Sequence, residues 1–144
     1  FVIDPSQLEE ARAAGAAGVL LIVAALAPGQ LGPLMARSHE LGLDVLCEIH
    51  DNRELEVAMA AGCDLIGVNS RDLETLQVNL ETALRLGPRI PSQILRVAES
   101  GIQSAEDIRK LRDVGYQAFL VGESLMRAES PGEALKKLLA GAKA

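Results

Sequence analysis

The sequence has few aromatic residues and no long apolar run. Only Phe1, Tyr116 and Phe119 are aromatic, although 49% of the 144 residues are apolar. A core must therefore be built from Ala, Val, Ile and Leu, which suit buried parallel strands covered by helices. No apolar run reaches the roughly 18 residues of a membrane span, and no charged and then apolar leader precedes a cleavage site. We expect a cytoplasmic protein without a membrane partner.

The sequence also lacks an excess of basic residues and the spacing of metal ligands. Its formal net charge is -6 at pH 7, which opposes binding to nucleic acid and to anionic membranes. Cys47 and Cys63 stand in apolar surroundings without a CxxC or Cys/His spacing. We interpret them as buried free thiols and predict no metal site. An anionic ligand would have to be held locally.

Short apolar runs alternate with amphipathic segments along the chain. The runs predict strands, and the segments rich in Ala, Leu, Glu and Arg between them have helical spacing. The predicted strands cover residues 18–24, 43–49, 65–68, 94–98 and 118–121. Residues 1–3 have the pattern of the end of another strand. This alternation is typical of α/β folds with parallel strands, but it does not separate an open sheet from part of a closed barrel.

Helix ends are marked by glycines and by capping residues. The glycines that close helical segments, where a left-handed conformation is often needed, are Gly15, Gly42, Gly62, Gly87 and Gly115. The predicted N-caps, each followed three residues later by Gln, Glu or Asp, are Asp4, Asp51, Ser104 and Ser130. No Pro- or Ser-rich linker interrupts the series, so residues 1–144 are predicted to form a single domain.

Ligand sites in parallel α/β folds form where the strands end, so polar residues there are candidates for function. Glu48 lies between apolar neighbours near the end of a strand predicted to be buried. Burial disfavours a charged carboxylate and would suit Glu48 to proton transfer. The alternative is a structural ion pair with Arg71 or another cation. His50 is interpreted as a helix-entry or structural residue.

Three further strand ends carry polar residues or glycines. Asn69 could orient a polar group, and Arg71 could bind a carboxylate or phosphate, unless they are turn and surface residues. The segments Ser100-Gly101 and Gly122-Glu123-Ser124 would let backbone amides approach an anion, and two neighbouring turns can hold one phosphate. The alternative is that glycine serves only the turns themselves. The GxGxxG and GxxxxGK[ST] motifs are absent.

Longer motifs follow one another along the whole chain. They are FVIDPSQLEEARAAGA, VLLIVAAL, CEIHDNRELE, LIGVNSRDLETLQVNLET, VAESGI and FLVGESLM. Together they resemble the indole-3-glycerol-phosphate synthase family. The resemblance implies a TIM (β/α)8 barrel, here a partial barrel that lacks the first strands. It also implies a carboxy-lyase of tryptophan biosynthesis that uses no cofactor or metal. Its substrate is a sugar phosphate, 1-(2-carboxyphenylamino)-1-deoxyribulose 5-phosphate, converted to indole-3-glycerol phosphate, carbon dioxide and water.

The resemblance assigns roles to individual residues. Glu48 matches the family's acid/base carboxylate, and Asn69 matches an amide that positions a catalytic group. Arg71 matches an arginine near the anthranilate carboxylate, and Glu99 and Ser100 match a pair that contacts the substrate. The other matches are to phosphate turns, at Gly101, Gly122 and Glu123, and to an apolar wall around the aromatic ring, at Phe1, Leu20, Leu73 and Leu76. Ordinary core packing is the alternative for the four wall residues.

The match departs from the family in two respects. The family's general-acid lysine precedes the residue matched by Phe1, and a second lysine and a glutamate lie on the first strand. We therefore expect this chain alone to be inactive, with self-association or an N-terminal segment completing the barrel. Glu123 stands where a small polar residue is common, and it would repel phosphate unless its side chain turned outward.

Two alternatives to this activity stay open. The first is another phosphate-binding barrel enzyme, of the phosphoribosylanthranilate isomerase or tryptophan synthase α type. The second is a noncatalytic phosphate-binding module built from a partial barrel.

Overall fold

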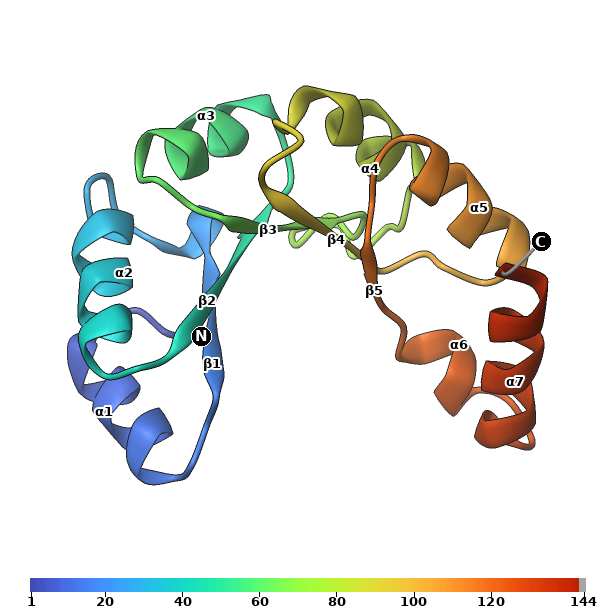
Figure 1. Cartoon of the computed structure of the whole chain (residues 1–144), viewed down its shortest axis with the longest axis horizontal. Helices are drawn as coiled ribbons and strands as arrows, with labels where there is room; N and C mark the ends of the chain where they lie inside the picture. The colour runs from blue at the N-terminus through green and yellow to red at the C-terminus, as the bar shows by residue number, and fades with distance from the viewer. Residues whose placement is uncertain (143–144) are drawn as a thin grey trace. The chain divides into compact units, whose positions relative to one another are not determined.

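The computed structural model describes residues 1–142, which alternate between helices and strands (Figure 1). The chain divides into two compact units, unit 1 with residues Phe1–Gly67 and unit 2 from Val68 onward. The boundary falls inside a strand, β3 (Leu65–Asn69), which begins in unit 1 and ends in unit 2. The single domain predicted for residues 1–144 stays a prediction.

Unit 1 places helices against a pair of parallel strands. Its elements are α1 (Pro5–Ala13), β1 (Gly18–Ile22), the 3-10 turn η1 (Val23–Ala25), α2 (Leu31–Glu40), β2 (Asp44–Ile49) and α3 (Asn52–Ala60), followed by the first residues of β3. β1 and β2 pair with Leu20 opposite Leu46 and Ile22 opposite Glu48. Figure 1 shows α1 and α2 side by side along β1 and β2, and α2 packs on both strands.

Unit 2 repeats this arrangement. After β3 come α4 (Glu81–Leu86), the 3-10 turn η2 (Gly87–Arg89), β4 (Leu95–Glu99), α5 (Ala105–Asp113), β5 (Ala118–Leu120), α6 (Glu123–Met126) and α7 (Pro131–Ala142). β4 and β5 are parallel, with Val97 opposite Ala118, and α5 packs against α4 and α7. The strand order β1-β2-β3-β4-β5 confirms the predicted fold class of parallel β/α units.

The first predicted strand is shorter than expected. Residues 18–24 were predicted as one strand, but β1 ends at Ile22 and the chain turns into η1. The Leu26 amide donates to the carbonyl oxygen of Val23 (3.1 Å), which is the three-residue step of a 3-10 turn. A continuous apolar run does not mark such a turn, because Val23 remains buried in it.

The prediction of a strand at residues 1–3 is wrong. The Ile3 amide donates to Gln7 Oε1 (2.8 Å), and Gln7 Nε2 donates to the carbonyl oxygen of Phe1 (3.0 Å). The same Gln7 side chain accepts from the Asp4 amide (3.0 Å) and so completes the predicted capping box of α1. One side chain of α1 thus satisfies backbone groups that would otherwise need a neighbouring strand.

The two capping patterns after β2 and β4 differ in detail. At α5, Ser104 and Asp107 form the full predicted box. At α3, Asp51 Oδ1 accepts from the Glu54 amide (2.9 Å), but the Glu54 side chain accepts from the His50 amide (2.7 Å) rather than from the N-cap. The sequence patterns are alike, so only the structure separates them.

Gly87 serves close packing rather than a left-handed turn, which corrects its predicted role. Its φ is -47°, and a Cβ at this position would lie 2.7 Å from Tyr116 Cε2. Tyr116 is 2% exposed, and its hydroxyl donates to the carbonyl oxygen of Ala83 (2.8 Å). Burial raises the pKa of Tyr116, so the phenol stays protonated and remains a donor.

We expect Tyr116→Phe to lower the free energy of unfolding by about 1 kcal/mol. The substitution removes the donor to Ala83, while the backbone amide of Gly87 still reaches that carbonyl oxygen. Urea denaturation measures the change. Unfolding is followed by circular dichroism, because Tyr116 is the only tyrosine in the chain and its fluorescence is absent from the variant. An unchanged midpoint would show that this hydrogen bond contributes nothing to stability.

The buried core is aliphatic and contains a small group of sulfur atoms in unit 1. Among the largest fully buried side chains are Leu8, Leu21, Ile49 and Leu111. Met35 Sδ lies 3.9 Å from Cys47 Sγ and 3.4 Å from Cys63 Sγ. Both cysteines are buried and free, as predicted.

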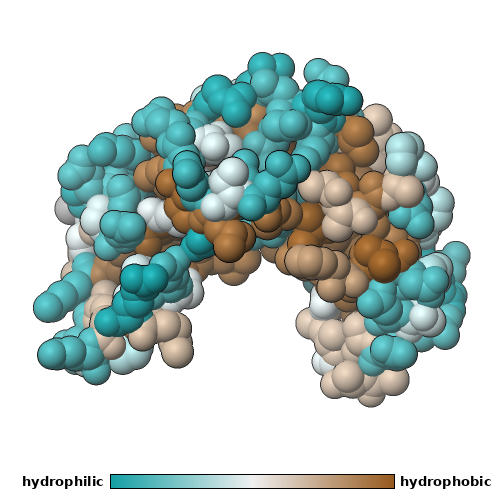
Figure 2. Space-filling model, turned by 180° about the vertical axis from the view of Figure 1, so that it is seen from behind, coloured by the Kyte–Doolittle hydropathy of each residue, from teal (hydrophilic) through white to brown (hydrophobic). Residues whose placement is uncertain are grey.

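Large apolar side chains are exposed in both units. Leu20 on β1 is 37% exposed and Leu120 on β5 is 50% exposed, and Figure 2 shows brown apolar surface lying among teal polar side chains on one face. Exposed apolar residues on terminal strands of the sheet are compatible with self-association, which stays a prediction. None of the helices within residues 1–142 is long and apolar enough to cross a membrane.

Candidate active site

The carboxyl end of β2 carries the most buried charged cluster of unit 1. Glu48 is 3% exposed and Glu54, from the first turn of α3, lies on the other side of the His50 ring. His50 Nε2 is 3.3 Å from Glu48 Oε1, and His50 Nδ1 is 3.1 Å from Glu54 Oε2. The Glu48 carboxylate close to Nε2, and then the hydrogen bond with Glu54, raise the pKa of His50 to about 9. The ring is therefore an imidazolium at neutral pH, lying between two carboxylates.

Leu20 lies on the same face of the sheet as Glu48. Strand register pairs Ile22 with Glu48, and Leu20 precedes Ile22 by two residues, so its side chain points to the same side. Leu20 is thus a partly exposed apolar neighbour of the Glu48 face. Phe1 is 86% exposed, and its backbone binds Gln7.

The loop that follows β3 in unit 2 is ordered by side-chain hydrogen bonds. Asn69 Oδ1 accepts from the Arg71 amide (3.0 Å), which makes a tight turn directly after the strand. The guanidinium of Arg71 donates to the carbonyl oxygen of Leu76 (3.0 Å) and binds Glu123 Oε2 at 2.5 Å. Leu76 has a φ of 59° and is 63% exposed, and Leu73 in the same loop is 41% exposed.

The carboxyl end of β4 forms a turn with two consecutive left-handed residues. Glu99 is 6% exposed and its carbonyl oxygen accepts from the Ser70 amide (2.8 Å). Ser100 follows with φ 62° and Gly101 with φ 80°. A Cβ on Gly101 would lie 2.8 Å from Val78 Cγ1, so this turn requires glycine. A serine held at positive φ is strained, which is common at binding sites.

The turn after β5 lies beside the turn after β4. Ser124 Oγ donates to the carbonyl oxygen of Ile102 (3.0 Å) and joins the two. A Cβ on Gly122 would meet nothing within 4 Å, so the space above this residue is open. Glu123 binds Arg71 and also Arg127 (2.8 Å). Two arginines thus compensate the charge of Glu123, which reduces its repulsion of a phosphate bound at these turns.

A hollow of about 540 Å3 lies over these two turns. Predicted site residues that line it are Arg71, Leu76, Gly101, Gly122 and Glu123. The structure thus brings together the predicted phosphate turns, one arginine and one apolar residue within unit 2. Leu73, Asn69, Glu99 and Ser100 lie on the adjoining loop and strand ends, outside this lining.

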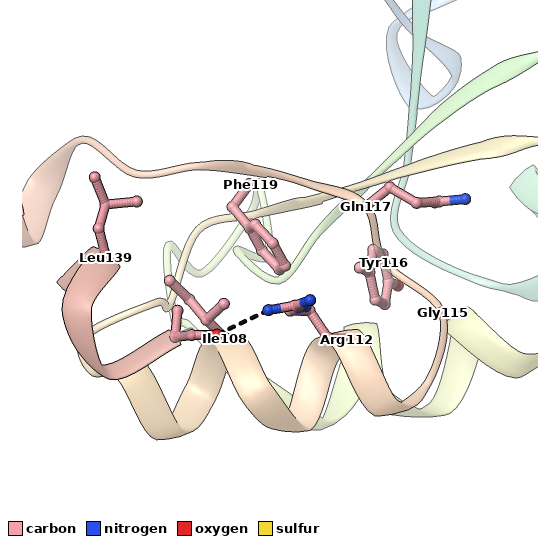
Figure 3. A pocket seen from close by; sticks show the side chains of 8 residues that line it. Ile108, Arg112, Gly115, Tyr116, Gln117, Phe119 and Leu139 are labelled. Carbon is pink, nitrogen blue, oxygen red and sulfur yellow. Dashed lines mark hydrogen bonds between the residues drawn. The ribbon is translucent and has the colours of Figure 1, made fainter. Parts of the chain in front are cut away.

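A second hollow, of about 680 Å3, lies between α5, β5 and α7 (Figure 3). Its lining is mainly apolar, with Ile108, Phe119 and Leu139 around Arg112. Arg112 Nη1 donates to the carbonyl oxygen of Ala142 (2.7 Å), the interaction drawn as a dashed line. None of the predicted site residues lines this hollow, and Arg112, the one cation among the described residues of its lining, donates to Ala142. We therefore place the candidate site at the smaller, more polar hollow.

Removing the carboxylate of Glu123 should free its two arginines for an external anion. We expect Glu123→Gln to tighten binding of inorganic phosphate to the chain by about two- to fivefold, because exposed ion pairs are worth up to about 1 kcal/mol. Isothermal titration calorimetry measures the affinity, with Glu129→Gln as a control for loss of one negative charge near α6. Weaker binding by Glu123→Gln would mean that Glu123 itself supports the anion site.

Sequence reasoning missed three contacts around the candidate site. The ion pair of Glu123 and Arg127 had a signal in the sequence, because the two residues are four positions apart and such a spacing favours an ion pair on a helix. The position of Glu54 three residues after an N-cap suggests only a capping role. Nothing in the sequence indicates that Ser124 bonds to Ile102, because that contact joins two separate turns.

The fold and the site define a parallel β/α protein of the barrel type, with polar side chains and glycine turns at the carboxyl ends of its strands. Enzymes of this type hold their ligands at that end. The family model for indole-3-glycerol phosphate synthase matches residues 1–138. The chain therefore belongs to the indole-3-glycerol phosphate synthase family, as its motifs predict.

Curated relatives support the same family. The chain is 55% identical over 139 residues to an indole-3-glycerol phosphate synthase of Koribacter versatilis, covering 96% of this chain and 54% of that protein. It is 51% identical over 140 residues to the enzyme of the same name from Bordetella pertussis, covering 97% of this chain and 53% of that protein. The chain thus spans about half the length of the curated relatives it matches.

Solved structures with lower identity support the fold alone. A thiamine phosphate pyrophosphorylase from Pyrococcus furiosus is 22% identical, with a TM-score of 0.70, covering 94% of this chain and 64% of that chain. A mandelate oxidase mutant is 17% identical, with a TM-score of 0.69, covering 96% of this chain and 52% of that chain. Parallel β/α units of the TIM-barrel type are therefore the architecture of residues 1–142.

Proposed function

We propose that this chain supplies the later half of the active site of an indole-3-glycerol-phosphate synthase. Such an enzyme is a carboxy-lyase of tryptophan biosynthesis, and we place it in the cytoplasm. The substrate would be the sugar phosphate 1-(2-carboxyphenylamino)-1-deoxyribulose 5-phosphate. The observation that carries the proposal is the family match over residues 1–138, joined to a buried glutamate and a hollow over glycine turns at strand ends.

The proposed roles follow the chemistry of each group. Glu48 would move a proton during dehydration, with Asn69, Glu99 and Ser100 orienting the reacting groups. Arg71 would bind the carboxylate of the substrate, because a guanidinium can fork onto that group. The turns at Gly101, Gly122 and Glu123 would hold the phosphate through backbone amides. The apolar side chains Phe1, Leu20, Leu73 and Leu76 would contact the aromatic ring.

The rest of the site would come from a segment equivalent to the half of the relatives that this chain does not span. We define the completed protein as the 144-residue chain joined to the remaining half of the Koribacter versatilis relative. The 144-residue chain alone is expected to be inactive, and the completed protein is expected to produce indole-3-glycerol phosphate. The fluorescence of the indole product measures the reaction.

A folded completed protein that makes no indole-3-glycerol phosphate would overturn the proposal. Turnover of a different sugar phosphate would favour the related barrel enzymes. The hollow over the glycine turns of unit 2 also supports a second candidate, a noncatalytic phosphate-binding module. Calorimetry of the 144-residue chain with indole-3-glycerol phosphate tests this candidate. The candidate requires that the chain binds this product and that the completed protein does not catalyse the reaction.

A further inference from the structure

A triad of side chains at the end of β2 is only partly used by the proposed mechanism. Glu48 and His50 come from the strand and its exit, while Glu54 comes from α3. The exposed fractions of the Glu48, His50 and Glu54 side chains are 4%, 16% and 20%. Three ionisable groups removed from water at such short separations influence one another strongly. All three lie within unit 1.

The His50 ring is fixed from two directions. Glu54 Oε2 accepts both from the His50 backbone amide (2.7 Å) and at the ring Nδ1 (3.1 Å). Glu54 is itself fixed, because its backbone amide donates to Asp51 Oδ1 at the start of α3. With Nδ1 bound to Glu54, the opposite ring nitrogen faces Glu48 at 3.3 Å. The first turn of α3 thus sets the direction in which the imidazole meets the Glu48 carboxylate.

The surrounding elements contribute little competing charge. η1 packs against both β2 and α3 and consists of Val23, Ala24 and Ala25, which carry no ionisable groups. β1, beside β2, has the sequence GVLLI. On α2, Arg37 is paired with Glu9 and Glu40. Asp51 and Arg53, which follow His50 in the sequence, are exposed. Within unit 1, the charged groups that raise the pKa of His50 are Glu48 and Glu54.

We propose that His50 is a positioning residue for Glu48: its imidazolium, oriented by Glu54, holds the Glu48 carboxylate at the end of β2 and keeps it ionised. This inference rests on the proposed role of Glu48 in proton transfer. A cation at ion-pair distance favours the charged form of a carboxylate and opposes the effect of burial. Glu48 would then enter the reaction as a base in a fixed orientation. His50 itself does not touch the substrate in this scheme.

The kinetic test compares His50→Gln with Glu56→Gln in the completed protein. Glu56 is exposed on α3, and Glu56→Gln is the charge-matched control for Glu54→Gln on the same helix. We expect His50→Gln to lower kcat about tenfold with KM nearly unchanged, because orientation of a base is lost while binding groups remain. The acid limb of the kcat pH profile should move to higher pH. Glu54→Gln should also lower kcat and move the acid limb to higher pH. Glu56→Gln should change neither kcat nor the acid limb.

A wild-type kcat and pH profile in His50→Gln would overturn the inference. A purely structural role would lower the thermal stability of His50→Gln and leave the pH profile of the remaining active enzyme in place, which also overturns it. Rescue of the profile by His50→Lys, which restores a cation, would support it.

A second measurement separates this inference from the proposed function. The chain has only two histidines, so NMR of the 144-residue chain can follow the His50 ring with His39 on α2 as the reference. We expect Glu48→Gln to lower the titration midpoint of His50, because coupling between two groups is reciprocal. An unchanged midpoint overturns the inference even if the completed protein is active. A lowered midpoint in an inactive completed protein overturns only the proposed function.

Discussion

Glu48→Gln is expected to lower kcat/KM of the completed protein by about 10²- to 10⁴-fold, the range of general acid–base catalysis. Glutamine keeps the size of the buried side chain but cannot accept or return a proton. The assay is product fluorescence under single-turnover conditions, with circular dichroism to confirm folding. Glu106→Gln is the control, since Glu106 lies on α5 in an exposed ion pair with Lys110. This control variant should keep full activity. Retention of more than half the activity by Glu48→Gln would remove Glu48 from the mechanism.

The second large effect is a loss of stability at alkaline pH. The folded-state pKa of His50, about 9, lies above its ordinary value of 6.5. Stabilisation by the protonated ring is therefore complete below about pH 6.5 and is lost as the pH rises through 9. The free energy of unfolding should fall by about 3 kcal/mol across this window, from the conversion of a pKa difference into energy.

Urea denaturation at a series of pH values measures this loss, and His50→Gln supplies the matched control. The variant keeps the other groups that titrate in the window and lacks only the imidazole, so the difference between the two curves isolates His50. We expect the wild-type advantage to be largest at about pH 6 and to vanish above about pH 9.5. Two parallel curves would show that the ring is not stabilised by its two glutamates.

Much of the fold follows from local sequence signals. Apolar runs such as 43–49 and 118–121 predict strands at β2 and β5, because a strand buried by helices needs apolar residues on both faces. The Asp4 and Ser104 boxes are local and were predicted correctly. Residues 1–3 were not, because a strand requires a partner and a single glutamine three residues into α1 satisfies their backbone instead.

The candidate site was predictable in its membership but less so in its contacts. Strand ends and family motifs point to Arg71, Gly101, Gly122 and Glu123, which do line one hollow. The pairing of Arg71 with Glu123 joins residues 52 positions apart, so no local pattern contains it. The His50 triad was obscured for a different reason, since Glu54 has the spacing of a capping residue and its real partner is the residue before the cap.

The hydrogen bond from Ser124 to Ile102 joins two turns that are 22 residues apart in the sequence. Its consequence concerns the entropy of ligand binding. Two separate turns would each lose conformational freedom when they closed on the same anion, and that loss would weaken the complex. Here the hydroxyl fixes their spacing when unit 2 folds, so the ordering is complete before a ligand arrives. A ligand that contacts both turns would meet a preorganised surface.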